Sequence, residues 1–153
     1  MRARRVLLIV ALASVAVFVL IQFIPYGHDH TNPSVTAEPA WDSPQTRALA
    51  GRACFDCHSN LTKWPWYSNI APESWLIQRD VDGGRSTLDF SEWDRSQDAG
   101  VGDIVEAVNG GGMPPWYYTL LHPKARLSKA EKAQLVAGLQ RTLQRSPPVG
   151  GGG

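Results

Sequence analysis

A single apolar stretch near the N-terminus constrains this chain most, because no other part of the sequence is apolar enough to cross a membrane. It runs from Val6 to Ile24 and is interrupted only by Ser14 and Gln22. As a helix that rises about 1.5 Å per residue, it covers about 28 Å, close to the ~30 Å thickness of the hydrocarbon layer. The sequence therefore excludes a transmembrane bundle and predicts one anchor attached to a domain outside the bilayer.

The charges before this stretch predict its orientation. Arg2, Arg4 and Arg5 precede it, and positive charge is retained on the cytoplasmic side of a membrane. A cleaved signal peptide is the alternative, although its apolar region usually spans only ~7–15 residues. The small residues around Ala37 resemble a cleavage site but lie far beyond the apolar stretch. Both interpretations place the rest of the chain outside the cytoplasm.

Prolines and glycines divide the remaining sequence. Three prolines interrupt the region after the apolar stretch, and we expect His28 and His30 in this region to be solvated. A Pro-Pro pair and four glycines end the chain. These features predict four segments: an N-terminal membrane anchor or signal peptide over residues 1–25, a tether over 26–41, a folded domain over 42–146 and a disordered tail over 147–153.

Charge and cysteine content exclude two classes of protein. The chain has 15 Lys and Arg against 14 Asp and Glu, a net charge of +1, which argues against nucleic-acid binding through a basic surface. Two cysteines are too few for a scaffold held together by disulfides.

The folded domain shows clear helix signals and poor strand signals. Four helices are predicted: from Ser43-Pro44 into Cys54, from Pro72 to Gly83-Gly84, around Val101–Val108, and from the capping box Ser128–Glu131 through Leu143. Short helices joined by irregular loops predict an all-α, cytochrome c-like domain. Such a small core would gain stability from a bound prosthetic group.

The motif Cys54-Phe55-Asp56-Cys57-His58 predicts the chemistry of the chain. In C-x-x-C-H, two thiols one helical turn apart can each add to a haem vinyl group, and the adjacent histidine reaches the iron as an axial ligand. A thioredoxin-like dithiol, a zinc site and a plain disulfide are the alternatives. The first requires a strand before the motif, the second lacks two well-placed histidines, and the third leaves His58 unexplained.

A second axial ligand is predicted at Met113, the only methionine besides Met1. Three glycines before it allow the backbone to approach a large ring, and Pro114 and Pro115 after it stiffen the loop. A methionine that merely fills the core is the structural alternative. His122 is the alternative ligand, although a hydrogen bond to its own loop is the simpler role for it. An open sixth position is the third possibility.

Four further residues are candidates for contacts with the cofactor. Trp64, Trp66 and Tyr67 follow the motif closely and suit packing around a porphyrin, or equally an ordinary core. Arg85 follows a double glycine and suits an ion pair with a propionate, or equally an exposed surface position.

Several sequence segments together resemble the bacterial haem-binding domain family, over about residues 42–145. The resemblance is carried by Cys54–Asn60, Thr62–Pro72, Asp80-Val81 with Gly84-Arg85, Leu88–Trp93, Met113-Pro114 and His122–Ser128. It implies a small, exported, often membrane-anchored protein with a covalent haem, and it implies no particular pathway. Asp89 stands where the family pattern leads us to expect Asn.

The sequence thus predicts a c-type haem protein with one haem c, ligated by His58 and Met113. We expect electron transfer through brief contacts with redox partner proteins, in the periplasm or at the outer face of the cytoplasmic membrane, with the N-terminal helix in that membrane. A haem enzyme or a gas or redox sensor with an open sixth position is the alternative function, and a structural haem module is the third.

Overall fold

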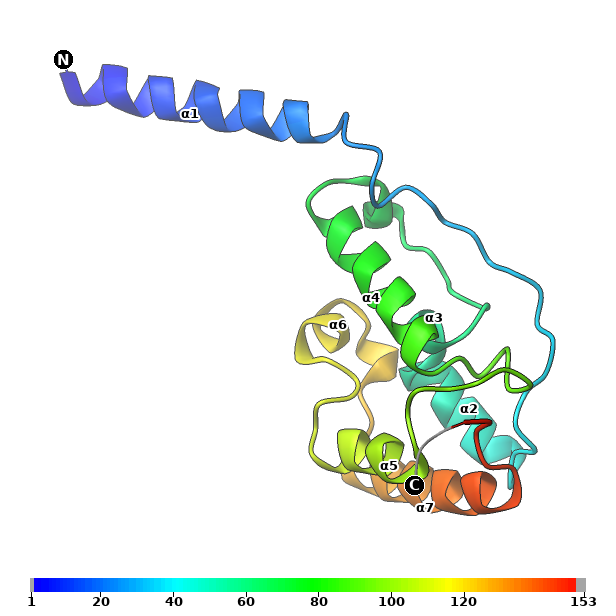
Figure 1. Ribbon diagram of the computed structural model, residues 1–153. Coiled ribbons are helices and arrows are strands. Elements are labelled where there is room, and N and C mark those ends of the chain that lie inside the picture. Colours follow the sequence, from blue (N-terminus) through cyan, green and yellow to red (C-terminus); the bar gives the residue numbers. More distant parts are fainter. Residues whose placement is uncertain (1, 151–153) are drawn as a thin grey trace. The chain divides into compact units, whose positions relative to one another are not determined.

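The computed structural model describes residues 2–150, in which all regular secondary structure is helical (Figure 1). The described part of the chain contains no β-strand, and its only β-type pairings are two isolated bridges. The all-α prediction is therefore confirmed. The elements are α1 (Arg2–Ile21), α2 (Pro44–Ala53), α3 (Phe55–His58), the 3-10 helix η1 (Trp66–Asn69), α4 (Glu73–Thr87), α5 (Val101–Asn109), α6 (Trp116–Leu121), the 3-10 helix η2 (Pro123–Ala125) and α7 (Lys129–Arg145).

Helix α1 is the candidate membrane span. It has 20 residues, of which an 18-residue window has a mean hydropathy of 2.4, and none of the 20 is buried within the protein. Its length and composition suit a bilayer, which agrees with the predicted anchor.

The described residues form two compact units. Residues 2–31 and 64–80 form the first, and residues 32–63 and 81–150 form the second. In the first unit, the chain after α1 packs against the segment 64–80. Gln22 exchanges two hydrogen bonds with the backbone of Ala71, both of 3.0 Å. Gly27, at φ +91°, approaches Ser74 so closely that a Cβ would lie 2.7 Å from the Ser74 carbonyl carbon.

The sequence led us to expect a solvated His30, but the structure shows that its side chain contacts the protein. Its ring stacks on Trp64 with centroids 4.4 Å apart, and its Nε2 lies 3.0 Å from the Ser68 carbonyl oxygen. The aromatic partner lies 34 residues further along the chain, so local composition gave no sign of this contact.

The second unit has an apolar core built by α2, α5, α7 and the loop after α4. Phe90 and Trp93 stack with ring centroids 5.8 Å apart, and Trp41 packs on Phe90 at 5.3 Å. Helix α7 supplies its apolar face, as its spacing predicted. The buried apolar cluster comprises Leu49, Ala50, Phe55, Leu88, Phe90, Trp93, Ile104, Val108, Leu135, Val136, Leu139 and Leu143.

The predicted helix starts are confirmed by their caps. The Ser43 hydroxyl accepts a hydrogen bond from the Thr46 amide at the start of α2, and Pro44 occupies the first helical turn. At α7, Ser128 and Glu131 form the predicted capping box.

One predicted helix end is wrong. Helix α4 does not stop at Gly83-Gly84 but continues to Thr87. Gly84 is a site of close packing against Cys57 there, and the pair does not terminate the helix.

The connecting segments are bound to the second unit more tightly than their composition suggests. The amides of Thr36 and Ala37 both donate to the Ser91 carbonyl, and the Gln97 amide donates to Val149 at 2.6 Å. Pro148 is buried. Residues 151–153 of the predicted tail lie outside the described residues.

Candidate functional site

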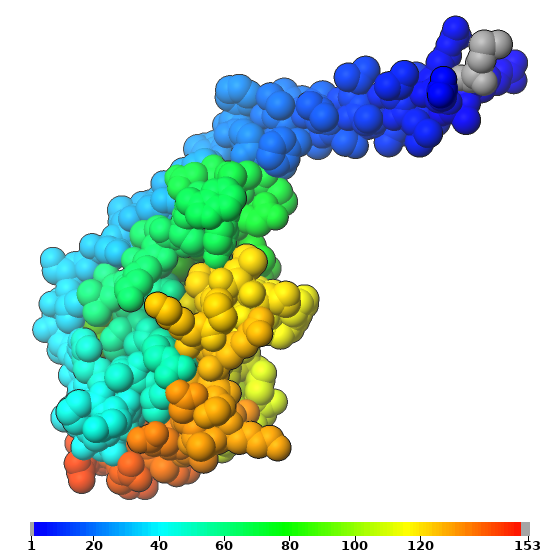
Figure 2. Space-filling model, turned by 180° about the vertical axis from the view of Figure 1, so that it is seen from behind, coloured from blue at the N-terminus to red at the C-terminus, as the bar shows by residue number. Residues whose placement is uncertain are grey.

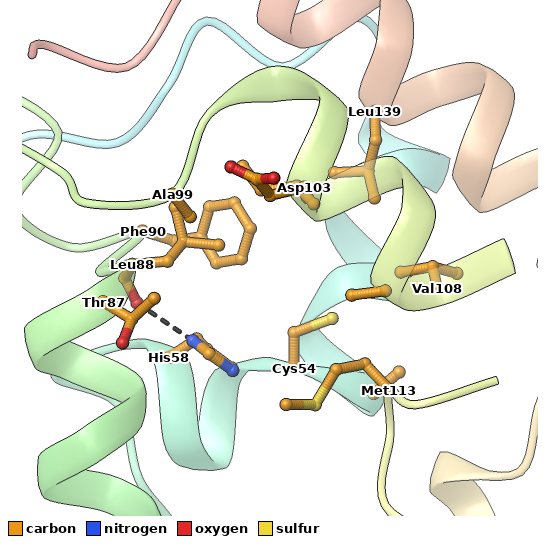
Figure 3. Close-up of a pocket in the computed structure, with 13 residues that line it drawn as sticks. Cys54, His58, Thr87, Leu88, Phe90, Ala99, Asp103, Val108, Met113 and Leu139 are labelled. Atoms are coloured by element: carbon orange, nitrogen blue, oxygen red, sulfur yellow. Dashed lines mark hydrogen bonds between the residues drawn. The ribbon is translucent and has the colours of Figure 1, made fainter. Parts of the chain in front are cut away.

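The second unit contains an apolar pocket between α3, the end of α4, α5 and the loop after α5 (Figure 3). Its cavity volume is about 170 Å³, below the ~300–1,000 Å³ usual for small-molecule and cofactor sites, and the pocket opens to solvent at its mouth. Its lining residues are Ala53, Cys54, His58, Thr87, Leu88, Phe90, Ala99, Asp103, Ile104, Ala107, Val108, Met113 and Leu139. Three of them, Cys54, His58 and Met113, are the chemically reactive residues singled out in the sequence.

The cysteines lie at the two ends of the first turn of α3. Cys54 caps both the end of α2 and the start of α3, and its side chain faces the pocket. Burial, aided by the neighbouring Cys57, raises the pKa of the Cys54 thiol to about 12. Cys57 is half-buried and is not among the lining residues. Neither cysteine is in a disulfide.

His58 is fixed by two backbone carbonyls at the end of α4. Its Nδ1 lies 3.1 Å from the Gly84 oxygen and 3.0 Å from the Leu88 oxygen. Because carbonyl oxygens only accept hydrogen bonds, Nδ1 carries the proton and Nε2 of the neutral ring keeps its lone pair. Burial lowers the pKa of His58, which favours this neutral form, although the two carbonyls partly oppose the shift. Figure 3 shows the second ring nitrogen turned from the bonded edge toward the side where Met113 lies.

A glycine allows this approach between α3 and α4. A Cβ on Gly84 would collide with the carbonyl oxygen of Cys57 and lie 2.8 Å from its carbonyl carbon. These are backbone atoms that cannot rotate away. The neighbouring Gly83 has no atom within 4 Å of its Cβ position, so only the second glycine is needed for the contact.

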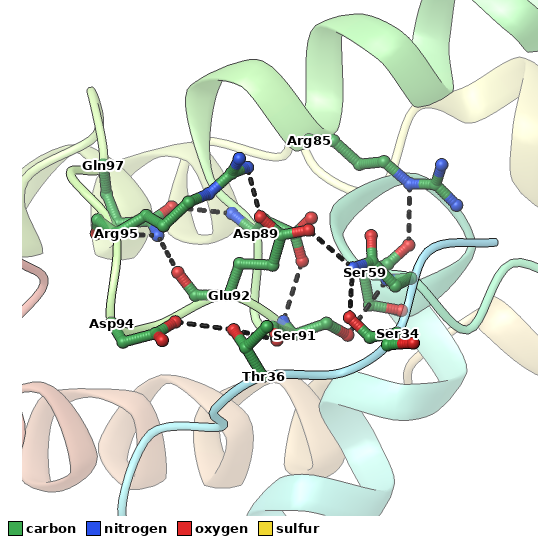
Figure 4. A network of polar contacts seen from close by, with 11 residues as sticks. Ser34, Thr36, Ser59, Arg85, Asp89, Ser91, Glu92, Asp94, Arg95 and Gln97 are labelled. Carbon is green, nitrogen blue, oxygen red and sulfur yellow. Dashed lines mark hydrogen bonds and ion pairs between the residues drawn. The ribbon is translucent and has the colours of Figure 1, made fainter. Parts of the chain in front are cut away.

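A buried polar network fixes the segment that carries the Leu88 carbonyl (Figure 4). The Phe90 amide donates to the His58 carbonyl at 2.9 Å, and the Asn60 amide donates to the Ser91 hydroxyl at 2.9 Å. Further bonds join Asn60 to Glu92, Ser91 to Asp89, and Asp89 to Gln97, each at 2.7 Å. The loop is thus hydrogen-bonded along its length to the residues around His58.

Asp89 is 2 % exposed within this network. Burial is the main cause that raises its pKa, and the nearby Glu92 adds to the shift. The Ser91 amide, Arg85 and Arg95 act in the opposite direction.

Met113 lines the pocket from the loop after α5, as its setting predicted. Its amide donates to the Ala107 carbonyl at 2.9 Å, and its side chain is 38 % exposed. His122, the alternative ligand, is not among the lining residues. Its Nδ1 donates to the Tyr118 carbonyl at 2.9 Å and its ring stacks on Tyr118, which is the local role expected for it.

The remaining candidates have identifiable neighbours. Arg85 donates to the Ser59 carbonyl at 3.0 Å and to Asn32 and Thr62 at 2.9 Å each, so it braces the loop after the C-x-x-C-H motif. Trp64, Trp66 and Tyr67 lie in the first unit. Trp66 is 77 % exposed and contacts Tyr67 edge to face.

The structure also identifies features that the sequence analysis missed. The apolar face of α5 was predicted to be helical, but not to form a pocket wall through Ile104 and Val108. The two carbonyls that hold His58 have no side-chain signature, and only the Gly83-Gly84 pair inside a helical pattern hinted at close packing. Among residues 2–150, no group of three or more His, Cys, Asp and Glu side chains is placed to hold a metal ion.

This donor set fits a haem. One imidazole nitrogen with a free lone pair and one thioether could supply two iron ligands, a thiol lies beside them, and the walls are apolar, as a porphyrin requires.

Comparison with known proteins gives one match. Residues 16–141 match a family model described as a haem-binding domain. No curated protein and no solved structure matches this chain. The match begins within α1 and ends within α7, so it includes every residue that lines the pocket.

Proposed function

This chain belongs to the haem-binding domain family, and we propose that it is a membrane-anchored electron carrier with one covalently attached haem c. The family match shows haem binding. The observation that supports the finer proposal is that Cys54, His58 and Met113 line the same apolar pocket.

Cys54 and Cys57 are the proposed attachment residues. Each thiol would add across one vinyl group, so that its sulfur bonds to one vinyl carbon and its hydrogen passes to the other. No oxidant is consumed, and the reaction requires reduced cysteines. The raised pKa of Cys54 keeps it in the thiol form at neutral pH.

His58 and Met113 are the proposed iron ligands. When bound, the haem iron supplies a reversible one-electron couple, whose potential is raised by Met/His ligation. The Gly84 and Leu88 carbonyls hold the imidazole with Nε2 available, as second-sphere partners commonly do for metal-bound histidines. The apolar walls would pack against the porphyrin. We also propose that Arg85, which belongs to the same unit as the pocket, contacts a haem propionate.

Helix α1 would hold the protein in the cytoplasmic membrane, with the haem domain on the periplasmic or outer side. This orientation rests on the three arginines before the span. Redox partners would then bind briefly at that face.

Covalent attachment is tested by acid–acetone extraction of protein made with cytochrome-maturation machinery. We expect the haem to stay with the polypeptide in the wild type. Cys54→Ser and Cys57→Ser should each retain one thioether, and the double variant should release its haem. Haem that extracts freely from the wild type contradicts the proposal.

The sixth ligand is tested by spectroscopy of the holoprotein. We expect a weak methionine-to-iron charge-transfer band in the oxidised wild type, and slow carbon monoxide binding in the reduced form. Met113→Ala should abolish the band, lower the reduction potential and open the iron to carbon monoxide. His122→Ala should have little effect on any of the three.

Two results would contradict methionine ligation. If the wild type lacks the methionine-to-iron charge-transfer band and His122→Ala changes the absorption spectrum, the iron has two histidine ligands. Rapid carbon monoxide binding by the wild type indicates an open site and favours a haem enzyme or sensor.

A further inference from the structure

The short helix α6 follows the Met113 loop and has little apolar contact to hold it in place. None of its six residues is buried, and Trp116 and Leu121 are 75 % and 62 % exposed. Figure 2 shows this part of the chain (yellow) at the surface. Because burial contributes little here, specific polar contacts must set the position of α6 and of the loop before it.

One polar contact joins α6 to the C-x-x-C-H motif. The Tyr118 hydroxyl donates a hydrogen bond of 2.6 Å to Oδ2 of Asp56, which stands between the two cysteines. The other oxygen of Asp56 accepts from the Lys63 amide at 3.1 Å. A hydroxyl bound to a carboxylate at this distance is a strong, charge-assisted hydrogen bond.

The Met113 loop is therefore held at both ends. On the α5 side, the Met113 amide is bonded to Ala107. On the α6 side, Tyr118 is bonded to Asp56, and Pro114 and Pro115 stiffen the chain between them. The Tyr118 ring is itself held by stacking on His122, with centroids 4.0 Å apart. The contact thus links the segment that carries Met113 to the segment that carries His58.

We propose that the Tyr118–Asp56 hydrogen bond is a latch that holds Met113 over the pocket and keeps the sixth iron position closed. The inference rests on the proposed His58/Met113 ligation. Tyr118 and Asp56 are positioning residues in this scheme, because both act through the Met113 loop.

The test uses Tyr118→Phe in the full-length holoprotein. Phenylalanine keeps the ring and its stacking on His122, so only the hydroxyl is lost. The loss of one hydrogen bond to a charged acceptor corresponds to about tenfold or more in an opening equilibrium. We therefore expect carbon monoxide to bind the reduced variant about tenfold faster and the charge-transfer band to weaken. Amide hydrogen exchange should become faster across Met113–Leu121.

Thr119→Val is the matched control, since it removes a hydroxyl from the next residue of the same helix, and that hydroxyl bonds within α6 to the Trp116 carbonyl. This variant should bind carbon monoxide at the wild-type rate, and it should keep the charge-transfer band and the amide hydrogen exchange rates of the wild type. Asp56→Asn is the second variant, which keeps an acceptor but removes the charge, and it should give a smaller change in the same direction as Tyr118→Phe.

The outcomes separate the latch from the proposed function. A wild type with the methionine band, together with a Tyr118→Phe protein that matches it in all three measurements, overturns the latch alone. Equal effects of Tyr118→Phe and Thr119→Val also overturn it. A wild type without the band that binds carbon monoxide rapidly overturns the ligation and the latch together.

Discussion

At the scale of single residues, the protonation of His58 follows from its hydrogen-bond partners. Two carbonyl oxygens face Nδ1, and an oxygen of this kind cannot donate. The ring is therefore set as an Nδ1–H tautomer before any ligand binds, with its lowered pKa favouring the neutral form. A histidine in free solution would have to give up the other tautomer and its proton first. The fold thus leaves Nε2 of a neutral His58 with a lone pair that a metal could accept.

Asp89 gives a prediction with a defined pH dependence. The folded-state pKa of Asp89 is raised, so the protonated carboxyl is favoured in the native protein and contributes to the free energy of unfolding at low pH. This contribution is lost as the pH rises through the folded-state pKa, because the carboxylate is then charged while buried. Asp89→Asn removes the charge and keeps an oxygen for the Ser91 amide. We expect a gain on the order of 1 kcal/mol in unfolding free energy at pH 7, and almost none at pH 3.

Urea unfolding of the holoprotein in detergent at both pH values measures this difference. Asp98→Asn is the control, because Asp98 is exposed, and it should change stability little at either pH. An Asp89→Asn protein that is less stable than the wild type at pH 7 would show that the charge itself supports the network.

At the scale of secondary-structure elements, the approach of α4 to α3 depends on one of two adjacent glycines. Gly84→Ala would place a Cβ against the backbone of Cys57, so the helices must separate. We expect a loss of about 1–3 kcal/mol in unfolding free energy. Less haem should also be incorporated, since the Gly84 carbonyl helps to hold His58.

Gly83→Ala is the matched control in the same helical turn. Its Cβ meets no atom within 4 Å, and alanine favours helix over glycine by about 0.5–1 kcal/mol. This variant should be as stable as the wild type or more so, with normal haem content. Unfolding curves and haem-to-protein ratios measure both effects, and similar losses in the two variants would contradict the packing argument.

The same glycines show how far elements could be predicted from the sequence. Caps and apolar spacing located α2, α4, α5 and α7, because these signals are local. The end of α4 was misplaced, since a double glycine usually stops a helix and the packing that overrides this comes from Cys57, 27 residues earlier. Helix α6 was missed because its six residues have no apolar period, and its anchoring contact is to Asp56.

At the scale of the whole molecule, the site could be predicted better than the organisation around it. Reactive side chains have recognisable spacing, so Cys54, His58 and Met113 were identified from the sequence and line one pocket. The segment predicted as a tether divides between two units, with residues up to Thr31 in the first and those from Asn32 in the second. Its partners, such as Ser74 and Ser91, lie tens of residues away, and local composition does not encode such contacts.

The orientation of the chain in the membrane gives the last prediction. Helix α1 is long and apolar enough to span, and Arg2, Arg4 and Arg5 should stay in the cytoplasm. Protease added to intact spheroplasts should therefore digest the pocket-bearing domain, while protein in the membrane pellet should resist carbonate extraction. Replacing the three arginines by glutamate removes the charge bias and should increase the protected fraction. Full protection of the wild type would reverse the orientation, and a mature protein that lacks residues 1–25 and appears in the soluble fraction would identify a cleaved signal peptide.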